Sequence, residues 1–351
     1  ACSLPLAAVA DQWQYSGAER IVAVSDIHGA YDALVATLQN AEVLDAELGW
    51  SGGPTHLVIV GDILDRGPDS REAMDLLMRL ETEAEAAGGM VHVLIGNHEA
   101  MNLVGDLRYV SREEFADFAG EETEEERERW LAEYASDKNA AGEITDELRR
   151  EFDERFPAGY FAHRREFEAD GTYGEWLLSQ PVVVVINGTA FVHGGLSPMI
   201  ADIGLDGVNA TLAGELEQYV ENLEPLYDAG VLTPMDNFYA HPRILQNYMP
   251  SVDADAALLD LVAETRELAA SDVLSESHRG PVIQGVLKNA VANLRTAMRV
   301  PDEYAVVFQP SATACMEVIC RNVVETRSFH FVHGAFSGRM AATAEQVGLA
   351  P

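Results

Sequence analysis

The hydrophobic pattern contains three short apolar runs, at residues 21–24, 57–60 and 91–95, and each ends in a group of polar residues. Continuous apolar runs of this length, bounded by turn residues, are typical of strands buried on both faces of a parallel sheet. A fourth run, residues 181–186, is followed by Asn187-Gly188 and an apolar return segment. This arrangement predicts a hairpin.

Helical periodicity follows two of these runs, at residues 31–41 and 71–87. Strands that alternate with helices predict a parallel core with right-handed crossover connections. Because ligand sites in such sheets lie at the carboxyl ends of the strands, several polar side chains are expected to meet at one rim. They are Asp26, His28, Asp62 and Asn97.

Residues 111–170 have a different pattern, which is polar, helical and strongly acidic. One interpretation is an insertion whose charged face is solvated. The other is a cap over the rim, with Tyr160, Phe161 or Tyr173 shaping a pocket. Its position favours the cap, because it leaves the core directly after the Asn97-His98 segment.

Composition narrows the set of partners. The 351 residues include 23 Lys and Arg against 58 Asp and Glu, a net charge of −35, which opposes binding to nucleic acid or to anionic membranes. Only two of the basic residues are lysines, Lys138 and Lys288. Such a balance is typical of proteins that work in high salt, and a generic acidic secreted protein is the alternative.

Localisation signals are sparse. No run approaches the roughly twenty apolar residues of a transmembrane helix. Ala1-Cys2 matches what remains at the cleavage point of a bacterial lipoprotein signal, which predicts a periplasmic or secreted protein anchored by a lipid on Cys2. A cytoplasmic protein is the alternative. Cys315 and Cys320 are expected to be buried free thiols.

The polar groups after the strands have the chemistry of a phosphate site. Residues 61–67, Gly-Asp-Ile-Leu-Asp-Arg-Gly, present two carboxylates and a guanidinium after a buried strand. A carboxylate there can bridge two cations, and an arginine fits a phosphate. One Gly-Asp pair is an ordinary turn, but residues 26–29 (Asp-Ile-His-Gly), 96–99 (Gly-Asn-His-Glu) and 193–195 (His-Gly-Gly) repeat the arrangement. The set therefore predicts a metal-assisted phosphate site.

These motifs resemble the signature set of the phosphoprotein phosphatase (PPP) group of dinuclear metallophosphatases. The bacterial Shewanella-like branch is the nearer match, because residues 88–92 and 105–110 also resemble it, and the similarity covers residues 20–275. The resemblance implies an α/β fold, the calcineurin-like metallophosphatase β-sandwich of mixed sheets flanked by helices. Residues 1–274 would form this domain, with residues 111–170 as a helical cap insertion.

The resemblance also implies two divalent metal ions. Asp26 and His28 would hold the first, Asp62 would bridge, and Asn97 and His193 would hold the second. Oxygen and imidazole ligands suit Mn, Fe or Zn, and Mg is also compatible. Two ions about 3.5–4 Å apart can clamp a phosphoryl group and activate a hydroxide for in-line attack.

Further roles follow from the same resemblance. His98 would act as the general acid toward the leaving group, and Asp65 would orient its ring. Arg66 and Asn97 would contact the phosphate, with Arg108 as a weaker candidate. Glu99 and His92 are expected to be structural.

The last part of the chain departs from the family pattern, because no Gly-His pair follows residue 240 to complete the second metal. Residues 275–351 resemble instead the opening portion of a class V, phosphoserine-type aminotransferase. Aminotransferase activity is not expected, since neither Lys138 nor Lys288 is placed to be the Schiff-base lysine.

Replacements for the missing groups are available in this region. His333 follows an apolar segment in the same way as His193, so it is the favoured ligand, ahead of His278 and His241. Water or a carboxylate could also fill the position. Arg243 and Arg279 are the candidates for a second phosphate arginine.

Two functions follow. The first is a metal-dependent phosphomonoesterase that acts on phosphorylated protein or peptide, at Ser, Thr or Tyr, or on small phosphate monoesters. The second is a metal- or phosphate-binding protein whose site is incomplete and inactive. A phosphodiesterase or nuclease also fits dinuclear chemistry, but the acidity of the chain opposes it. The sequence does not indicate the physiological substrate or the oligomeric state.

Overall fold

Two three-stranded sheets form the centre of the fold. The computed structural model describes residues 13–138, 142–195, 200–250 and 255–270, all within residues 1–276, the first of the chain's two units. The strand order is β2-β3-β4 in one sheet and β1-β5-β6 in the other. The strands are β1 (Gln14–Tyr15), β2 (Ile21–Val24), β3 (His56–Ile59), β4 (Met90–Val93), β5 (Val183–Ile186) and β6 (Thr189–Val192).

The β2-β3-β4 sheet is parallel, as the sequence predicts. Ala23 pairs with Val58, and Val58 pairs with His92, so the three strands end at the same edge. Leu57 and Ile59 belong to the main hydrophobic cluster, whereas Val58 belongs to the cluster shared with the second sheet. Because both faces of this sheet are buried, its strands read as continuous apolar runs.

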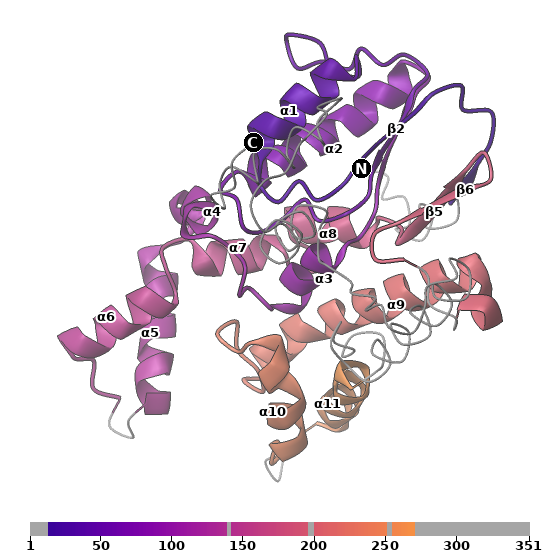
Figure 1. Cartoon of the computed structure of the whole chain (residues 1–351). Coiled ribbons are helices and arrows are strands. Elements are labelled where there is room, and N and C mark those ends of the chain that lie inside the picture. The colour runs from indigo at the N-terminus through magenta and orange to yellow at the C-terminus, as the bar shows by residue number, and fades with distance from the viewer. Residues whose placement is uncertain (1–12, 139–141, 196–199, 251–254, 271–351) are drawn as a thin grey trace, which may run out of the picture. The chain divides into compact units, whose positions relative to one another are not determined.

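Helices α1 (Tyr31–Asn40) and α2 (Ser70–Ala86) cover one face of this sheet (Figure 1). Their buried side chains include Leu34, Leu38, Met74 and Leu77, which recur at helical spacing. Both predicted helices are confirmed, with ends that differ by one residue.

The second sheet packs on the other face. Strands β5 and β6 are antiparallel, and both residues of their turn, Asn187 and Gly188, have positive φ (51° and 79°) as a two-residue hairpin requires. Val184 and Ile186 bury against Val58 and Leu94 of the first sheet. The α/β sandwich is therefore confirmed. Strand β1, which pairs in parallel with β5, was not expected.

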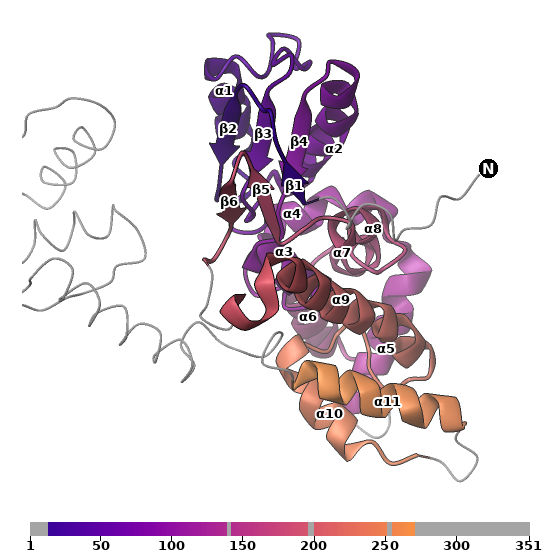
Figure 2. The same ribbon diagram turned by 90° about the vertical axis from the view of Figure 1, so that its right-hand side faces the viewer.

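The remaining described elements are helical (Figure 2). These elements are α3 (Asn97–Val104), α4 (Arg112–Asp117), η2 (Ala119–Glu121), α5 (Glu124–Lys138), α6 (Asp146–Arg155), α7 (Tyr160–Glu166), α8 (Thr172–Leu178), α9 (Ile200–Asp228), η3 (Phe238–Ala240), α10 (His241–Asn247) and α11 (Ala256–Ala269). Helix α9 changes direction at Gly204, where φ is 73°.

The acidic insertion has a hydrophobic core of its own. Leu131, Phe152 and Phe156 bury in a cluster that also takes in Tyr160 and Phe161. Tyr173 is only 2% exposed, and its hydroxyl donates to Asp75. The three aromatic residues named for a pocket are thus buried, and the cap over the rim stays a prediction.

Several expectations fall outside the described residues. They concern Cys2 and the segment 275–351, including His278, Arg279, Lys288, Cys315, Cys320 and His333. No helix in the described portion of the chain is long and apolar enough to cross a membrane.

Candidate metal centre

The predicted site residues meet at the carboxyl edge of the β2-β3-β4 sheet. The loops after β2 and β3 are joined by backbone hydrogen bonds, in which Asp26 donates to Gly61 (3.2 Å) and His28 donates to Asp62 (2.9 Å). His193 follows β6 of the other sheet, and its Nδ1 lies 2.7 Å from the Val60 carbonyl oxygen. Both sheets therefore contribute to one site.

The backbone around the site is strained. Asp26, His28, Asp62, Asp65 and Arg66 all have positive φ, between 49° and 72°. Non-glycine residues in this region cost about 1–3 kcal/mol each and persist where the surroundings over-determine them. Such residues cluster at functional sites, and five of the eight non-glycine residues with positive φ in the described chain belong to the predicted set.

Glu99 supplies much of that support. Its side chain is fully buried and accepts hydrogen bonds from the backbone amides of Asp62 (2.8 Å), Ile63 (2.7 Å) and Gly96 (2.8 Å). Burial and the Asp62 charge raise the pKa of Glu99, while these amides oppose the shift. A Cβ on Gly96 would lie 2.5 Å from Asp62 Oδ1, so this close approach requires glycine. The structural role expected for Glu99 is that of a clamp on the Asp62 loop.

Asp62 is the centre of the cluster. Its Oδ2 lies 3.2 Å from His193 Nε2, 3.6 Å from His28 Nε2 and 4.0 Å from His98 Nε2. Asp26 Oδ1 lies 3.9 Å from His28 Nε2. Within the described residues, two sets have ligand atoms within 4.8 Å of one another, namely His28 with Asp62 and His98, and Asp26 with Asp62 and His193.

The histidines are oriented for a cation. His28 Nδ1 lies 2.9 Å from the Leu64 carbonyl oxygen, and His193 Nδ1 bonds to Val60, so each ring directs Nε2 toward Asp62. A carbonyl that fixes Nδ1 in this way is the usual support of a metal-binding imidazole. His28 Nε2 is buried and has no hydrogen-bond partner in the described chain. The donor set therefore fits divalent metal ions.

The charge balance of the cluster depends on Asp62 and the histidines around it. The hydrogen bond that His193 donates to Asp62 raises the pKa of His193 to about 9, although burial opposes the shift. Burial alone would raise the pKa of Asp62, but the charges and hydrogen bonds of His193 and His98 lower it. The pocket thus stabilises positive charge at the point where the ligand atoms converge.

His98 and Asp65 form a buried pair beside this cluster. His98 Nδ1 lies 2.5 Å from Asp65 Oδ2, and Asn102 Nδ2 donates to Asp65 Oδ1 at 3.0 Å. Arg66 is exposed, and its Nη2 lies 3.1 Å from His98 Nε2. The sequence reasoning missed Asn102, although its position four residues after His98 on α3 could have indicated it.

The other predicted residues lie in different surroundings. Asn97 begins α3 with an exposed side chain whose Nδ2 lies 3.9 Å from Met101 Sδ. Arg108 is held by both oxygens of Asp106, at 2.7 and 2.8 Å. In the described chain, no hydrogen bond or ion pair links the exposed Arg243 to the site. His241, an alternative ligand, is buried and bonded to Tyr219 at 2.6 Å.

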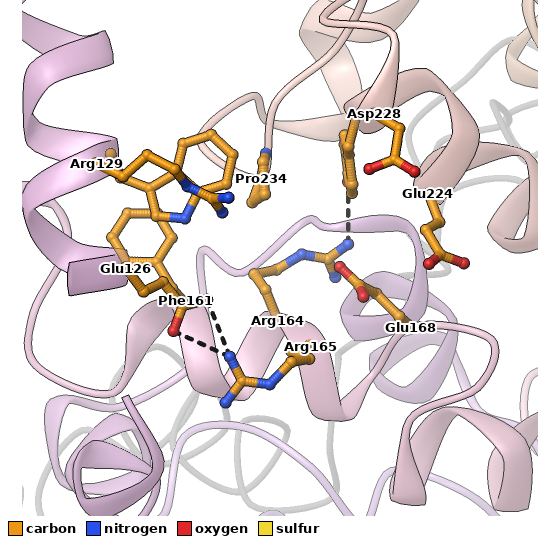
Figure 3. Close-up of a pocket in the computed structure, with 11 residues that line it drawn as sticks. Glu126, Arg129, Phe161, Arg164, Arg165, Glu168, Glu224, Asp228 and Pro234 are labelled. Atoms are coloured by element: carbon orange, nitrogen blue, oxygen red, sulfur yellow. Dashed lines mark hydrogen bonds and ion pairs between the residues drawn. The ribbon is translucent and has the colours of Figure 1, made fainter. Parts of the chain in front are cut away.

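A separate cavity lies among residues of α5, α7 and α9 (Figure 3). It has a volume of about 220 Å³ and is lined by Trp130, Arg164, Glu168 and Tyr227 among others. It includes none of the predicted site residues.

Comparison with known proteins identifies the fold family. A model of the calcineurin-like phosphoesterases matches residues 19–261. Shewanella-like protein phosphatase 2 of Arabidopsis thaliana is 32% identical over 217 residues, 58% of this chain and 53% of the relative. Shewanella-like protein phosphatase 1 of Plasmodium berghei is 25% identical over 211 residues, 60% of this chain and 48% of the relative. This chain thus spans about half the length of these curated relatives.

Among solved structures, a cold-active protein-tyrosine phosphatase from a psychrophilic Shewanella species is 27% identical, with a TM-score of 0.43. The match covers 72% of this chain and 65% of that chain. The relatives named Shewanella-like fit the predicted Shewanella-like branch, whereas its bacterial origin stays a prediction. Since the family model spans most of the sequence, from the start of the first sheet to α11, the chain belongs to the calcineurin-like phosphoesterase family.

Proposed function

We propose that the chain is a metal-dependent phosphomonoesterase in which His98 protonates the leaving group. Membership of the family supports phosphoesterase activity. The observation that carries the proposal is the position of Asp62 Oδ2, which lies within 4.0 Å of His28, His98 and His193. One carboxylate placed in this way can serve two cations while an acid group borders the same point.

In this proposal Asp26 and His28 hold one divalent ion, and Asn97 and His193 hold the other. Asp62 is shared. When bound, the ions supply Lewis acidity and an activated water for attack on phosphorus. The mixture of carboxylate, amide and imidazole ligands suits Mn, Fe, Zn or Mg.

The protein side chains orient the substrate and move the proton. Arg66 is exposed beside His98, where its guanidinium can grip two phosphate oxygens. His98 Nδ1 faces Asp65, so the proton for the leaving oxygen would be carried on Nε2. In the structure the Arg66 guanidinium, which can only donate, contacts Nε2, so Arg66 must leave this contact when it binds the phosphate. Asp65 orients the His98 ring.

We propose phosphorylated protein, at Ser, Thr or Tyr, as the substrate, with small phosphate monoesters accepted in vitro. The names of the matched relatives, which are protein phosphatases, support this class. A second candidate is a metal- or phosphate-binding protein without turnover. It is favoured by the exposed side chain of Asn97 and by the lack of a Gly-His pair after residue 240 in the sequence.

The test is hydrolysis of para-nitrophenyl phosphate by chelator-stripped protein, before and after addition of Mn²⁺. We expect Mn²⁺ to restore turnover. With phenyl phosphate, whose poor leaving group needs protonation, we expect His98→Asn to lower kcat by about 10²–10⁴-fold, the usual contribution of a general acid. With para-nitrophenyl phosphate, whose leaving group is good, the loss should be smaller. His333→Ala shows whether that residue takes part. His56→Asn is the matched control, because His56 bonds to His92 at the start of β3, away from the rim.

A metal count is made on each protein. Two bound ions with restored turnover support the enzyme. Full turnover of phenyl phosphate by His98→Asn contradicts the proposed role of His98. An inactive wild-type protein with one ion or none supports the binding protein.

A further inference from the structure

Two exposed tyrosine rings lie together on the surface beside His98. Tyr109 is 45% exposed and Tyr239 is 60% exposed, and among the described residues no other aromatic side chain is classed as exposed. Single exposed apolar groups are ordinary, but exposed groups that gather in one place mark surfaces that bind something. The proposed chemistry uses neither ring.

Tyr109 borders the residue proposed as the general acid. Its ring centroid lies 5.4 Å from that of His98, with 57° between the ring planes. The Arg66 backbone amide donates to the Tyr109 carbonyl oxygen at 2.9 Å, so Tyr109 is also fastened to the loop that carries the phosphate arginine. An oxygen that His98 protonates must come within about 2.6–3.2 Å of Nε2. The group bonded to that oxygen therefore leaves the metal centre within reach of the Tyr109 ring.

Arg108 joins Tyr109 to Tyr239. Its guanidinium carbon lies 5.6 Å from the centroid of the Tyr109 ring and 4.8 Å from that of the Tyr239 ring, and Nη2 donates to the Tyr239 hydroxyl at 3.2 Å. Cation–π contacts of this kind hold a guanidinium and a ring together. Arg108, Tyr109 and Tyr239 thus form one continuous surface, here called the aromatic wall.

The aromatic wall is supported from beneath by a buried carboxylate. Asp106 is 1% exposed, and its two oxygens hold Arg108 at 2.7 and 2.8 Å. Asn237 Nδ2 donates to Asp106 Oδ1 at 3.2 Å, and the Asn237 side chain accepts from the Tyr239 amide at 3.1 Å. Because these contacts already order the exposed side chains, a ligand that packs on them loses less entropy on binding.

We propose that Tyr109 is a specificity-determining residue: its ring packs against the leaving group, so the site prefers a flat aromatic leaving group to an alkyl one. This inference rests on the proposed function. Aromatic rings pair favourably in offset or edge-on arrangements with centroids about 4.5–7 Å apart. A phosphotyrosine side chain offers such a ring next to its phosphate, whereas phosphoserine and phosphothreonine do not.

The first test measures binding and needs no turnover. Phenylphosphonate and methylphosphonate are not hydrolysed, and calorimetry with Mn²⁺-loaded protein gives a Kd for each. We expect wild-type protein to bind phenylphosphonate more tightly. Tyr109→Leu should reduce the ratio of the two Kd values by about two- to tenfold, the contribution of one aromatic pair, with methylphosphonate binding unchanged.

Two further variants serve as matched controls. Tyr109→Phe keeps the ring and should keep the wild-type ratio of Kd values. Leu259→Ala changes an apolar side chain on α11 that is 40% exposed, and it should also follow the wild type.

The second test measures selectivity during turnover. Two peptides of one sequence carry either phosphotyrosine or phosphoserine, and kcat/KM is determined for each. Tyr109→Leu should lower the ratio of the two values, phosphotyrosine over phosphoserine, by a similar two- to tenfold factor. Tyr109→Phe should restore the wild-type ratio, because the ring and not the hydroxyl makes the contact.

Each failure has a different pattern. If Tyr109→Leu lowers kcat equally on both peptides and leaves the Kd ratio unchanged, the ring only supports His98 and the inference is overturned. Wild-type protein that binds the two phosphonates equally also overturns it, even if Tyr109→Leu does not fold. If metal-loaded wild-type protein hydrolyses neither peptide nor para-nitrophenyl phosphate, the proposed function is overturned, whereas the Kd ratios still decide whether Tyr109 contacts the aryl group.

Discussion

The strand-end rim and the helical insertion differ in which of their groups are energetically unfavourable, the backbone at the rim and buried polar side chains in the insertion. At the rim the backbone is strained at Asp26, His28, Asp62, Asp65 and Arg66, while most polar side chains there are hydrogen-bonded. In the described part of residues 111–170 no non-glycine residue has positive φ, but the insertion buries polar side chains without partners. Strain in the rim presents ligands, whereas unpaired groups in the insertion make stability depend on pH.

This contrast predicts which property each region controls. A substitution at the rim removes an atom that contacts metal or substrate, so it should abolish chemistry. A substitution in the insertion should change the free energy of unfolding and its pH dependence.

The largest effect is expected for Asp62→Asn. The amide has no charge to share between two cations, so we expect at least one metal ion to be lost and kcat to fall by about 10³-fold or more. Bound metal is measured by elemental analysis, and turnover with para-nitrophenyl phosphate. Asp32→Asn, an exposed carboxylate in the first turn of α1, is the control. Retained metal and turnover in Asp62→Asn would remove the basis for treating the rim as the chemical centre.

The rim could be predicted from the sequence because each part of it has a local sequence pattern. Apolar runs place the strands, and the residues after them, such as Asp62 and His98, follow from the rule that parallel strands end at one edge. Strand β1 was missed because its two residues, Gln14 and Tyr15, give no periodic pattern. Asn102 was missed because its partner Asp65 lies 37 residues away in the sequence.

The core of the insertion was harder to predict from the sequence, because its apolar residues are few and lie among many carboxylates. Leu131 and Tyr134 face a core within an otherwise charged helix. Glu114 stands beside the exposed Glu113 at the start of a helix, where acidic residues are common for reasons of the helix dipole. Nothing local distinguishes the buried glutamate from the exposed one, because its burial depends on α7 and on the Asp65 loop.

A smaller effect is expected for His163→Phe, which tests the buried side chains of the insertion that lack hydrogen-bond partners. The phenyl ring should fit among Phe115, Phe118 and Phe167 and remove two unpaired nitrogens, raising stability at pH 7 by about 1 kcal/mol.

The acid limb of the stability profile carries the stronger test of His163. The folded-state pKa, about 3, lies below the ordinary 6.5, so below pH 6.5 the unfolded state binds a proton that the folded state does not. Wild-type stability should therefore fall with acidification by up to roughly 1.4 kcal/mol per pH unit from this group. Thermal unfolding between pH 7 and 4 measures it, with His56→Phe as a half-buried control. If the stability of His163→Phe falls with acidification as steeply as that of the wild type, His163 is not a buried neutral group.

The smallest effect is expected for Glu168→Gln, in the cavity between the insertion and α9. Figure 3 shows Glu168 beside the Arg164 guanidinium, which donates to the Asn102 carbonyl oxygen and the Tyr227 hydroxyl. Burial raises the pKa of Glu168 to about 7, against the opposing charge of Arg164. Because the folded-state pKa is raised, the contribution to stability is present in acid and lost as the pH rises through about 7.

Glu168→Gln should therefore unfold at a slightly higher temperature than wild type at pH 8 and at nearly the same temperature at pH 5. We expect a difference below about 1 kcal/mol, because Glu168 is only partly buried and solvent screens its charge. Glu175→Gln, whose carboxylate is exposed on α8, should leave both curves unchanged. If Glu168→Gln instead lowers stability at pH 8, then Glu168 is ionised and paired with Arg164. In that case the cavity resembles the rim, where charged side chains have partners. The buried side chains without hydrogen-bond partners in the described part of the insertion are then Glu114 and His163.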